Sequence, residues 1–178
     1  WASTAAAVVA LCVSIGISVH YFRQVNQMSQ QTFVVSAEKG QRSNVVLPDG
    51  TKVWLNSDTE IKYSGEYGKK DRQISLSGEA YFEVAKDPKH RFIVQAGEMQ
   101  VEALGTTFNV KAYPDELKLY TTLVEGKVEV FSDYLHRGVM LYPGEQAVSD
   151  SSEIQKRQVN VQPYISWKEG KFVFINAP

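Results

Sequence analysis

The chain has 178 residues and a formal net charge of −1, from 19 Lys and Arg against 20 Asp and Glu. Such a balance, without a basic stripe, gives no electrostatic support for nucleic acid as a partner. The single cysteine, Cys12, lies in an apolar N-terminal segment, so the rest of the chain has neither a disulfide nor a cysteine metal site. Because the first residue is Trp1 rather than Met, we expect further sequence before it.

The first predicted element is a membrane-spanning helix over residues 1–23. No charged side chain occurs before Arg23. A helix rises ~1.5 Å per residue, so about 21 apolar residues cover the ~30 Å hydrocarbon core of a bilayer. Trp1 and Tyr21 suit the two interfaces. A signal peptide and a buried soluble helix are the alternatives, and charge does not decide the orientation.

Residues 24–32 are polar and Gln-rich, which is typical of a tether beside the membrane. From 33 to 165, apolar residues alternate or come in short runs between glycine turns, a pattern that predicts strands. Pro48-Asp49-Gly50 is a clear hairpin signal. The fold class is therefore mainly β, an N-terminal transmembrane helix followed by an all-β domain with stacked sandwich or solenoid-like sheets. The predicted strands are Val45–Leu47, Lys52–Leu55, Gln73–Leu76, Ala80–Ala85, Phe92–Gln95, Gln100–Leu104, Thr107–Ala112, Lys118–Val124, Lys127–Phe131, Gly138–Leu141, Glu145–Val148, Gln158–Val161 and Lys171–Ile175.

The chain carries no motif of an enzyme, a metal site or a cofactor site, so we expect no cofactor. The three histidines are scattered through the sequence, at His20, His90 and His136. Glu79 and Glu83 share a face of one predicted strand, but four residues place them about 13 Å apart. Paired glycosidase carboxylates lie ~5–9.5 Å apart. We interpret the segment as a half-buried strand whose exposed face carries both glutamates.

One peptide bond suggests a reaction of the chain with itself. Gly105-Thr106 stands between two predicted strands. A threonine hydroxyl can attack the preceding carbonyl and convert the amide into an ester, which water then hydrolyses. Glycine on the acyl side has no Cβ in the way and tolerates unusual backbone angles. The alternative is a glycine bulge with no chemistry.

Taken in order, several segments resemble the FecR family of transmembrane anti-sigma regulators of bacterial surface signalling, most of all its Bacteroidetes members. Each segment is weak alone, but their order and spacing cover nearly the whole region after the tether. The matching segments are Leu47–Asn56, Leu76–Lys86, Phe92–Val94, Val101–Val110, Thr122–Val130, Leu141–Gln146 and Trp167–Phe172.

The resemblance implies a single-pass protein of the inner membrane with its β-domain, residues 33–165, in the periplasm. A cytoplasmic N-terminal domain, outside this chain, would bind an extracytoplasmic-function (ECF) sigma factor. Residues 166–178 would begin a secretin/TonB N-terminal-like domain, which would contact the signalling domain of a TonB-dependent outer-membrane receptor. Site-1 and site-2 type proteases would then release the sigma factor.

Some members of the family cleave themselves at a Gly-Thr bond that corresponds to Gly105-Thr106, so the resemblance implies a cleavage site here. Thr107 and Asn109 differ from the residues of those self-cleaving relatives. An alternative function is a membrane-anchored carbohydrate-binding module. Its stacking surface would use exposed aromatic side chains, for which the candidates are Tyr63, Tyr67, Tyr113 and Tyr134.

Overall fold

The computed structural model describes residues 11, 13–22, 31–132, 134–150 and 152–171. Residues 11 and 13–22 are helical. Among the described residues, no helix combines the length and the apolar character needed to cross a membrane. Residues 1–10, 12 and 23 of the predicted span, and most of the predicted tether, lie outside the described residues. The span therefore stays a prediction.

Strands make up most of the regular structure, which confirms the mainly-β prediction. Short glycine turns separate many of them, as the sequence pattern indicates. The strands are β1 Thr32–Ala37, β2 Ser43–Val46, β3 Lys52–Leu55, β4 Thr59–Ser64, β5 Arg72–Glu83, β6 Phe92–Ala96, β7 Met99–Ala103, β8 Thr107–Ala112, β9 Leu119–Glu125, β10 Val128–Ser132, β11 Arg137–Leu141, β12 Glu145–Ser149 and β13 Ile154–Gln158.

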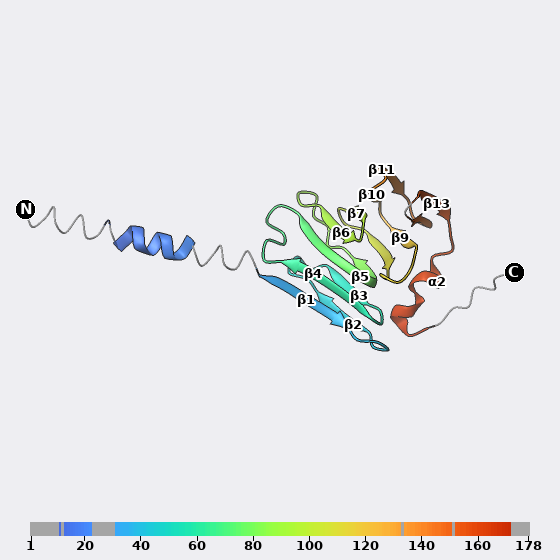
Figure 1. Cartoon of the computed structure of the whole chain (residues 1–178), viewed down its shortest axis with the longest axis horizontal. Coiled ribbons are helices and arrows are strands. Elements are labelled where there is room, and N and C mark those ends of the chain that lie inside the picture. The colour runs from blue at the N-terminus through green and yellow to red at the C-terminus, as the bar shows by residue number, and fades with distance from the viewer. Residues whose placement is uncertain (1–10, 12, 23–30, 133, 151, 172–178) are drawn as a thin grey trace, which may run out of the picture.

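The strands form two layers that share the long strand β5 (Figure 1). In the first layer the strand order is β1-β4-β5-β6-β7-β10-β11. In the second layer the order is β2-β3-β5-β8-β9-β12-β13. The chain thus crosses between the layers several times, and one of these crossings is the loop from β7 to β8.

Strand β5 changes layer at Gly78. Its first half pairs with β4 and β6, and its second half pairs with β3 and β8. Gly78 has φ +108°, and a Cβ at this position would lie 2.8 Å from the carbonyl oxygen of Asp58. Only glycine fits this bend. The prediction of two strands, Gln73–Leu76 and Ala80–Ala85, is wrong because the glycine bends the strand without ending it.

The hydrophobic core lies between the two layers. Phe82 stacks on Phe108 with ring centroids 5.2 Å apart, and it meets Phe92 edge-on at 5.8 Å. All three rings are fully buried. Burying one such side chain contributes roughly 1.5–3 kcal/mol, so this cluster couples β5, β6 and β8 into one unit.

A short C-terminal segment covers the outer face of the second layer (Figure 1). It consists of α2 Gln162–Ile165 and the 3-10 helix η1 Ser166–Glu169. Ile165 and Trp167 are buried against Tyr81 of β5. The predicted strand Gln158–Val161 is wrong, because β13 ends at Gln158 and the chain turns into a helix with proline in its first turn. Residues 172–175, most of the last predicted strand, lie outside the described residues.

Candidate functional site

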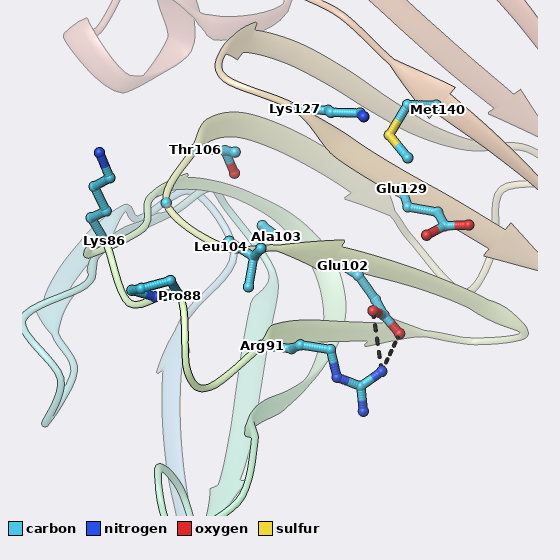
Figure 2. Close-up of a pocket in the computed structure, with 11 residues that line it drawn as sticks. Lys86, Pro88, Arg91, Glu102, Ala103, Leu104, Thr106, Lys127, Glu129 and Met140 are labelled. Carbon is cyan, nitrogen blue, oxygen red and sulfur yellow. Dashed lines mark hydrogen bonds and ion pairs between the residues drawn. The ribbon is translucent and has the colours of Figure 1, made fainter.

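The Gly105–Thr106 bond lies where the chain crosses from the first layer to the second. Leu104, Gly105 and Thr106 connect β7 to β8 (Figure 2). Leu104 and Gly105 are exposed, whereas Thr106 is buried. The carbonyl side of the bond therefore faces solvent and its amide side belongs to the interior.

Two backbone hydrogen bonds hold the bond from either side. The amide of Asp87 donates to the carbonyl oxygen of Leu104, and the amide of Val84 donates to that of Thr106, both at 3.0 Å. Gly105 has φ +153°, and a Cβ there would lie 2.9 Å from the Cα of Lys86. The segment that follows β5 thus presses against the junction, and this close approach requires glycine.

The Thr106 side chain is buried with its hydroxyl unused. Its Oγ1 has no hydrogen-bond partner among the described residues. Its methyl group lies where Leaving a buried hydroxyl unpaired costs about 1–3 kcal/mol. The lone pairs of this oxygen are free for an attack on the carbonyl carbon of Gly105.

Two cavities meet at this bond. The first has a volume of about 500 Å³ and lies between the segment after β5 and strands β10 and β11 (Figure 2). Its rim carries an ion pair between Arg91 and Glu102, 3.1 Å apart. The other residues that line it are Lys86, Pro88, Ala103, Leu104, Gly105, Thr106, Lys127, Glu129 and Met140.

The second cavity, of about 540 Å³, lies on the other side of the bond. Lys52, Glu83 and Glu125 are the ionisable residues that share it with Thr106. Lys52 and Glu83 form a long ion pair of 3.9 Å. Gly105 and Thr106 line both cavities, so open space borders the junction on two sides.

A polar pair stabilises the segment that presses on Gly105. His90 Nδ1 lies 2.7 Å from the carboxylate of Asp87, which also accepts a hydrogen bond from the Lys89 amide at 2.9 Å. The hydrogen bond with His90 lowers the pKa of Asp87 to about 2. Asp87 therefore stays ionised at neutral pH and fixes the turn whose own amide holds Leu104.

Behind this segment lies an ion pair that the sequence analysis missed. Arg72 is fully buried, and its Nη1 is 2.8 Å from the carboxylate of Asp49. Burial raises the pKa of Asp49, but hydrogen bonds from Thr51 and Arg72 outweigh it, so the pKa lies below its ordinary value. The pattern around Asp49 predicts only a turn, and one arginine in a strand gives no sign of its partner.

A second buried network lies under η1. Asn56 and Asn109 donate to the two carboxylate oxygens of Glu79, at 2.8 and 2.9 Å. The indole N–H of Trp167 donates to Asn109 at 3.3 Å. Burial raises the pKa of Glu79 above its ordinary value. The predicted exposed face of this strand is therefore wrong at Glu79 and at Tyr81, because the C-terminal segment covers both.

The side chains of the other predicted sites are dispersed. Tyr63 and Tyr67 pack against each other at 5.4 Å, and Tyr113 donates to the carbonyl of Ser57, so these tyrosines serve the fold itself. Tyr134 is exposed. In the part of the chain that the structure describes, no three His, Cys, Asp or Glu side chains are close enough to hold a metal ion.

Comparisons with known proteins agree with this architecture. The profile of the family described as FecR protein matches residues 33–129. Two crystal structures of a candidate anti-sigma factor from Parabacteroides distasonis ATCC 8503, at 2.50 and 1.65 Å resolution, are 34% identical to this chain. They superpose with TM-scores of 0.74 and 0.73 over 79% and 78% of it. No curated protein sequence matches.

This chain spans 66% and 65% of the length of those two structures, less than two thirds of each. The family profile covers β1 to the start of β10, which includes the Gly105–Thr106 junction and the segment that presses on it. Because the profile matches more than half of the chain, the protein belongs to the FecR family.

Proposed function

We propose that the protein is an anti-sigma regulator of the inner membrane. Its cytoplasmic part binds an ECF sigma factor, and its periplasmic β-domain receives a signal from a TonB-dependent outer-membrane receptor. Membership of the FecR family and the likeness to a candidate anti-sigma factor support this proposal. The apolar N-terminal segment, helical over residues 13–22, is the proposed membrane anchor.

We further propose that a cut at Gly105–Thr106 prepares the signal. Thr106 Oγ1 attacks the carbonyl carbon of Gly105, the C–N bond breaks, and the hydroxyl proton ends on the released amine. Water then hydrolyses the ester, which leaves a carboxylate on Gly105 and restores the threonine hydroxyl. Membrane proteases act afterwards, once the two halves separate.

The observation that carries this proposal is the position of the bond between the layers. The half before the cut contains β1 to β7, and the half after it contains β8 to β13. Six residue pairs join β5 to β8, and five join β7 to β10, so both halves belong to both layers. A cut at this loop breaks no strand pairing, and the halves remain together until a partner pulls them apart.

The cut is tested in the full-length protein with a different tag at each end. We expect two bands from the wild type and one from Thr106→Ala, since alanine lacks the nucleophile. Thr106→Ser keeps a hydroxyl and restores cleavage. Thr107→Ala removes the neighbouring hydroxyl and serves as the matched control, with cleavage unchanged. One uncut band from the wild type would contradict the proposed reaction.

The regulatory role is tested separately by co-expression with a cognate ECF sigma factor. The N-terminally tagged protein is expected to retain the sigma factor in the membrane fraction, and a variant that starts after residue 23 with the same N-terminal domain is expected to lose membrane retention. A wild-type protein that leaves the membrane on washing with alkaline carbonate would contradict the proposed anchor.

A further inference from the structure

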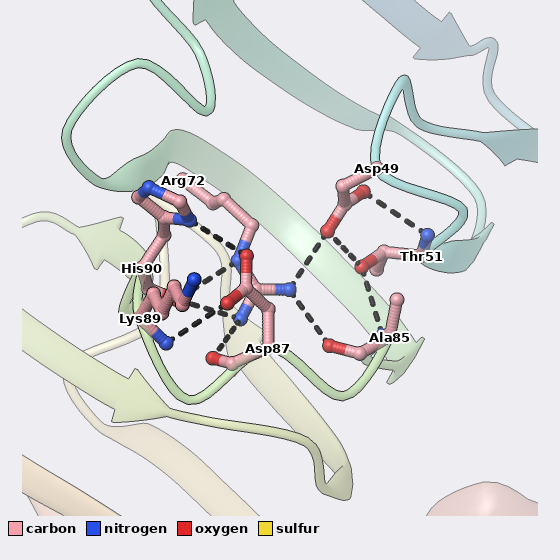
Figure 3. A network of polar contacts seen from close by, with 7 residues as sticks. All are labelled: Asp49, Thr51, Arg72, Ala85, Asp87, Lys89 and His90. Atoms are coloured by element: carbon pink, nitrogen blue, oxygen red, sulfur yellow. Dashed lines mark hydrogen bonds and ion pairs between the residues drawn. The ribbon is translucent and has the colours of Figure 1, made fainter.

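Arg72 uses its guanidinium to hold the segment that follows β5. Its Nε and Nη2 donate to the carbonyl oxygen of His90, at 3.1 and 2.8 Å. Its Nη1 donates to the carbonyl of Ala85 at 2.8 Å, and Nη2 reaches that of Asp87 at 3.4 Å (Figure 3). One side chain thus ties down three backbone carbonyls within six residues.

The anion that balances Arg72 also contacts the same segment, through Thr51. The Thr51 hydroxyl donates to Asp49 at 2.6 Å and accepts from the amide of Ala85 at 3.1 Å (Figure 3). A buried guanidinium is tolerated only when its charge and its N–H groups are paired. This arrangement satisfies both needs with the β2–β3 turn on one side and the segment on the other.

The same segment holds the Gly105–Thr106 bond. Val84 and Asp87 donate to the carbonyls on either side of that bond, and Lys86 abuts Gly105. Arg72 binds the carbonyls of residues 85, 87 and 90, which alternate with these contacts along the backbone. The path from the guanidinium to the bond is therefore a single hydrogen-bonded segment with no gap.

We propose that Arg72, with Asp49 and Thr51, is the positioning device of the Gly105–Thr106 junction. The inference rests on the proposed self-cleavage, because it assigns these residues to the alignment of that bond. Arg72 touches no reacting atom. It fixes the segment 84–90, and this segment fixes the carbonyls of residues 104 and 106, so the attacking hydroxyl and the Gly105 carbonyl keep a constant relative placement.

Arginine is required here for its geometry and not for its charge alone. A lysine has one ammonium with three donors and cannot reach three carbonyls and a carboxylate in a plane. Arg72→Lys therefore keeps the charge beside Asp49 but releases part of the segment. Thr51→Val removes only the hydroxyl between Asp49 and Ala85, and Thr51→Ser retains it.

The first measurement is amide hydrogen exchange of the full-length protein in the uncut Thr106→Ala background. Arg72→Lys is expected to speed exchange in peptides covering residues 84–87 by about tenfold or more, since the segment opens locally. Thr51→Val is expected to have the same effect at smaller size, and Thr51→Ser none. Ile61→Val is the control, because it loosens a buried β4 residue that pairs with Val35 and Leu76. Unchanged exchange at 84–87 in Arg72→Lys would overturn the proposal.

The second measurement is the half-time of cleavage in otherwise wild-type protein. Arg72→Lys and Thr51→Val are expected to slow it by about tenfold or more, with Thr51→Ser and Ile61→Val near the wild type. Faster exchange with unchanged cleavage would show that the segment is clamped but does not position the bond, and would overturn the proposal. If the wild type is never cut, the proposed reaction fails, and exchange alone then decides whether the clamp exists.

Discussion

The fold buries two charged groups, and it treats them in opposite ways. Arg72 has a carboxylate at 2.8 Å and backbone carbonyls for its other donors. Glu79 has two neutral amides and no hydrogen bond from a cation among its printed partners. A paired charge stays ionised and fixes the backbone around it, whereas a charge held only by dipoles pays for burial with a shifted pKa. The difference separates a rigid region at the junction from a titratable region under η1.

The largest expected effect comes from breaking the Arg72 network. Arg72→Met leaves Asp49 buried without its cation and strands three carbonyls, which is expected to lower the free energy of unfolding by about 3–5 kcal/mol. Denaturant unfolding of the Thr106→Ala protein measures this loss. Arg157→Met is the matched control, since that exposed arginine contacts Gln146 on the far hairpin. Equal losses in the two variants would remove the distinction between the buried pair and a surface contact.

A smaller effect is expected from uncovering Glu79. Trp167→Ala removes most of the cover and the hydrogen bond to Asn109, with an expected loss of about 3 kcal/mol, the low end for tryptophan truncation. The pKa of Glu79 is then expected to fall, because water reaches the carboxylate. Lys168→Ala, which removes a cation 3.9 Å above the Tyr81 ring, is the control, with a loss of about 1 kcal/mol or less. Nuclear magnetic resonance titration of Glu79 gives the pKa directly.

The smallest expected effect is a pH dependence from Glu79 itself. Its pKa in the folded protein lies above the ordinary 4.5, so the folded state binds the proton more readily than the unfolded chain. The free energy of unfolding therefore falls as pH rises from about 4.5 through the folded pKa, with a slope of at most about 1.4 kcal/mol per unit. Glu79→Gln is expected to lack this slope.

The control for that slope is Glu83→Gln, four residues along β5 and paired with Lys52 at 3.9 Å. It is expected to retain the decline between pH 4.5 and neutrality. Asp49 and Asp87 act in the opposite direction, because their lowered pKa values remove stability only as pH falls below the ordinary 3.8. A flat profile for wild-type protein above pH 4.5 would contradict the account of Glu79.

The sequence predicts the strands and the junction well, because both depend on local patterns. Glycine turns separate alternating segments, and the predicted Lys52–Leu55 and Thr107–Ala112 coincide with β3 and β8. Gly105-Thr106 is recognisable since glycine before a hydroxyl residue has chemical meaning by itself. These features need only neighbouring residues, and neighbouring residues are what a single sequence displays.

The rest depends on residues brought together across the chain. Asp49 lies 23 residues from Arg72, and Trp167 lies 58 residues from Asn109. No local pattern links such pairs. Alternation along β5 predicts an exposed face, and the cover supplied by α2 and η1 is invisible until the fold is known. Gly78 misleads for the same reason, because a turn and a layer-switching bend use the same residue.

The most direct test of the account is the mass of the purified full-length protein, measured once under native and once under denaturing conditions. The account predicts one species of intact mass plus one water in the native measurement. Under denaturing conditions it predicts two fragments that end at Gly105 and begin at Thr106. A single uncut chain under denaturing conditions, or separated fragments under native conditions, would contradict it.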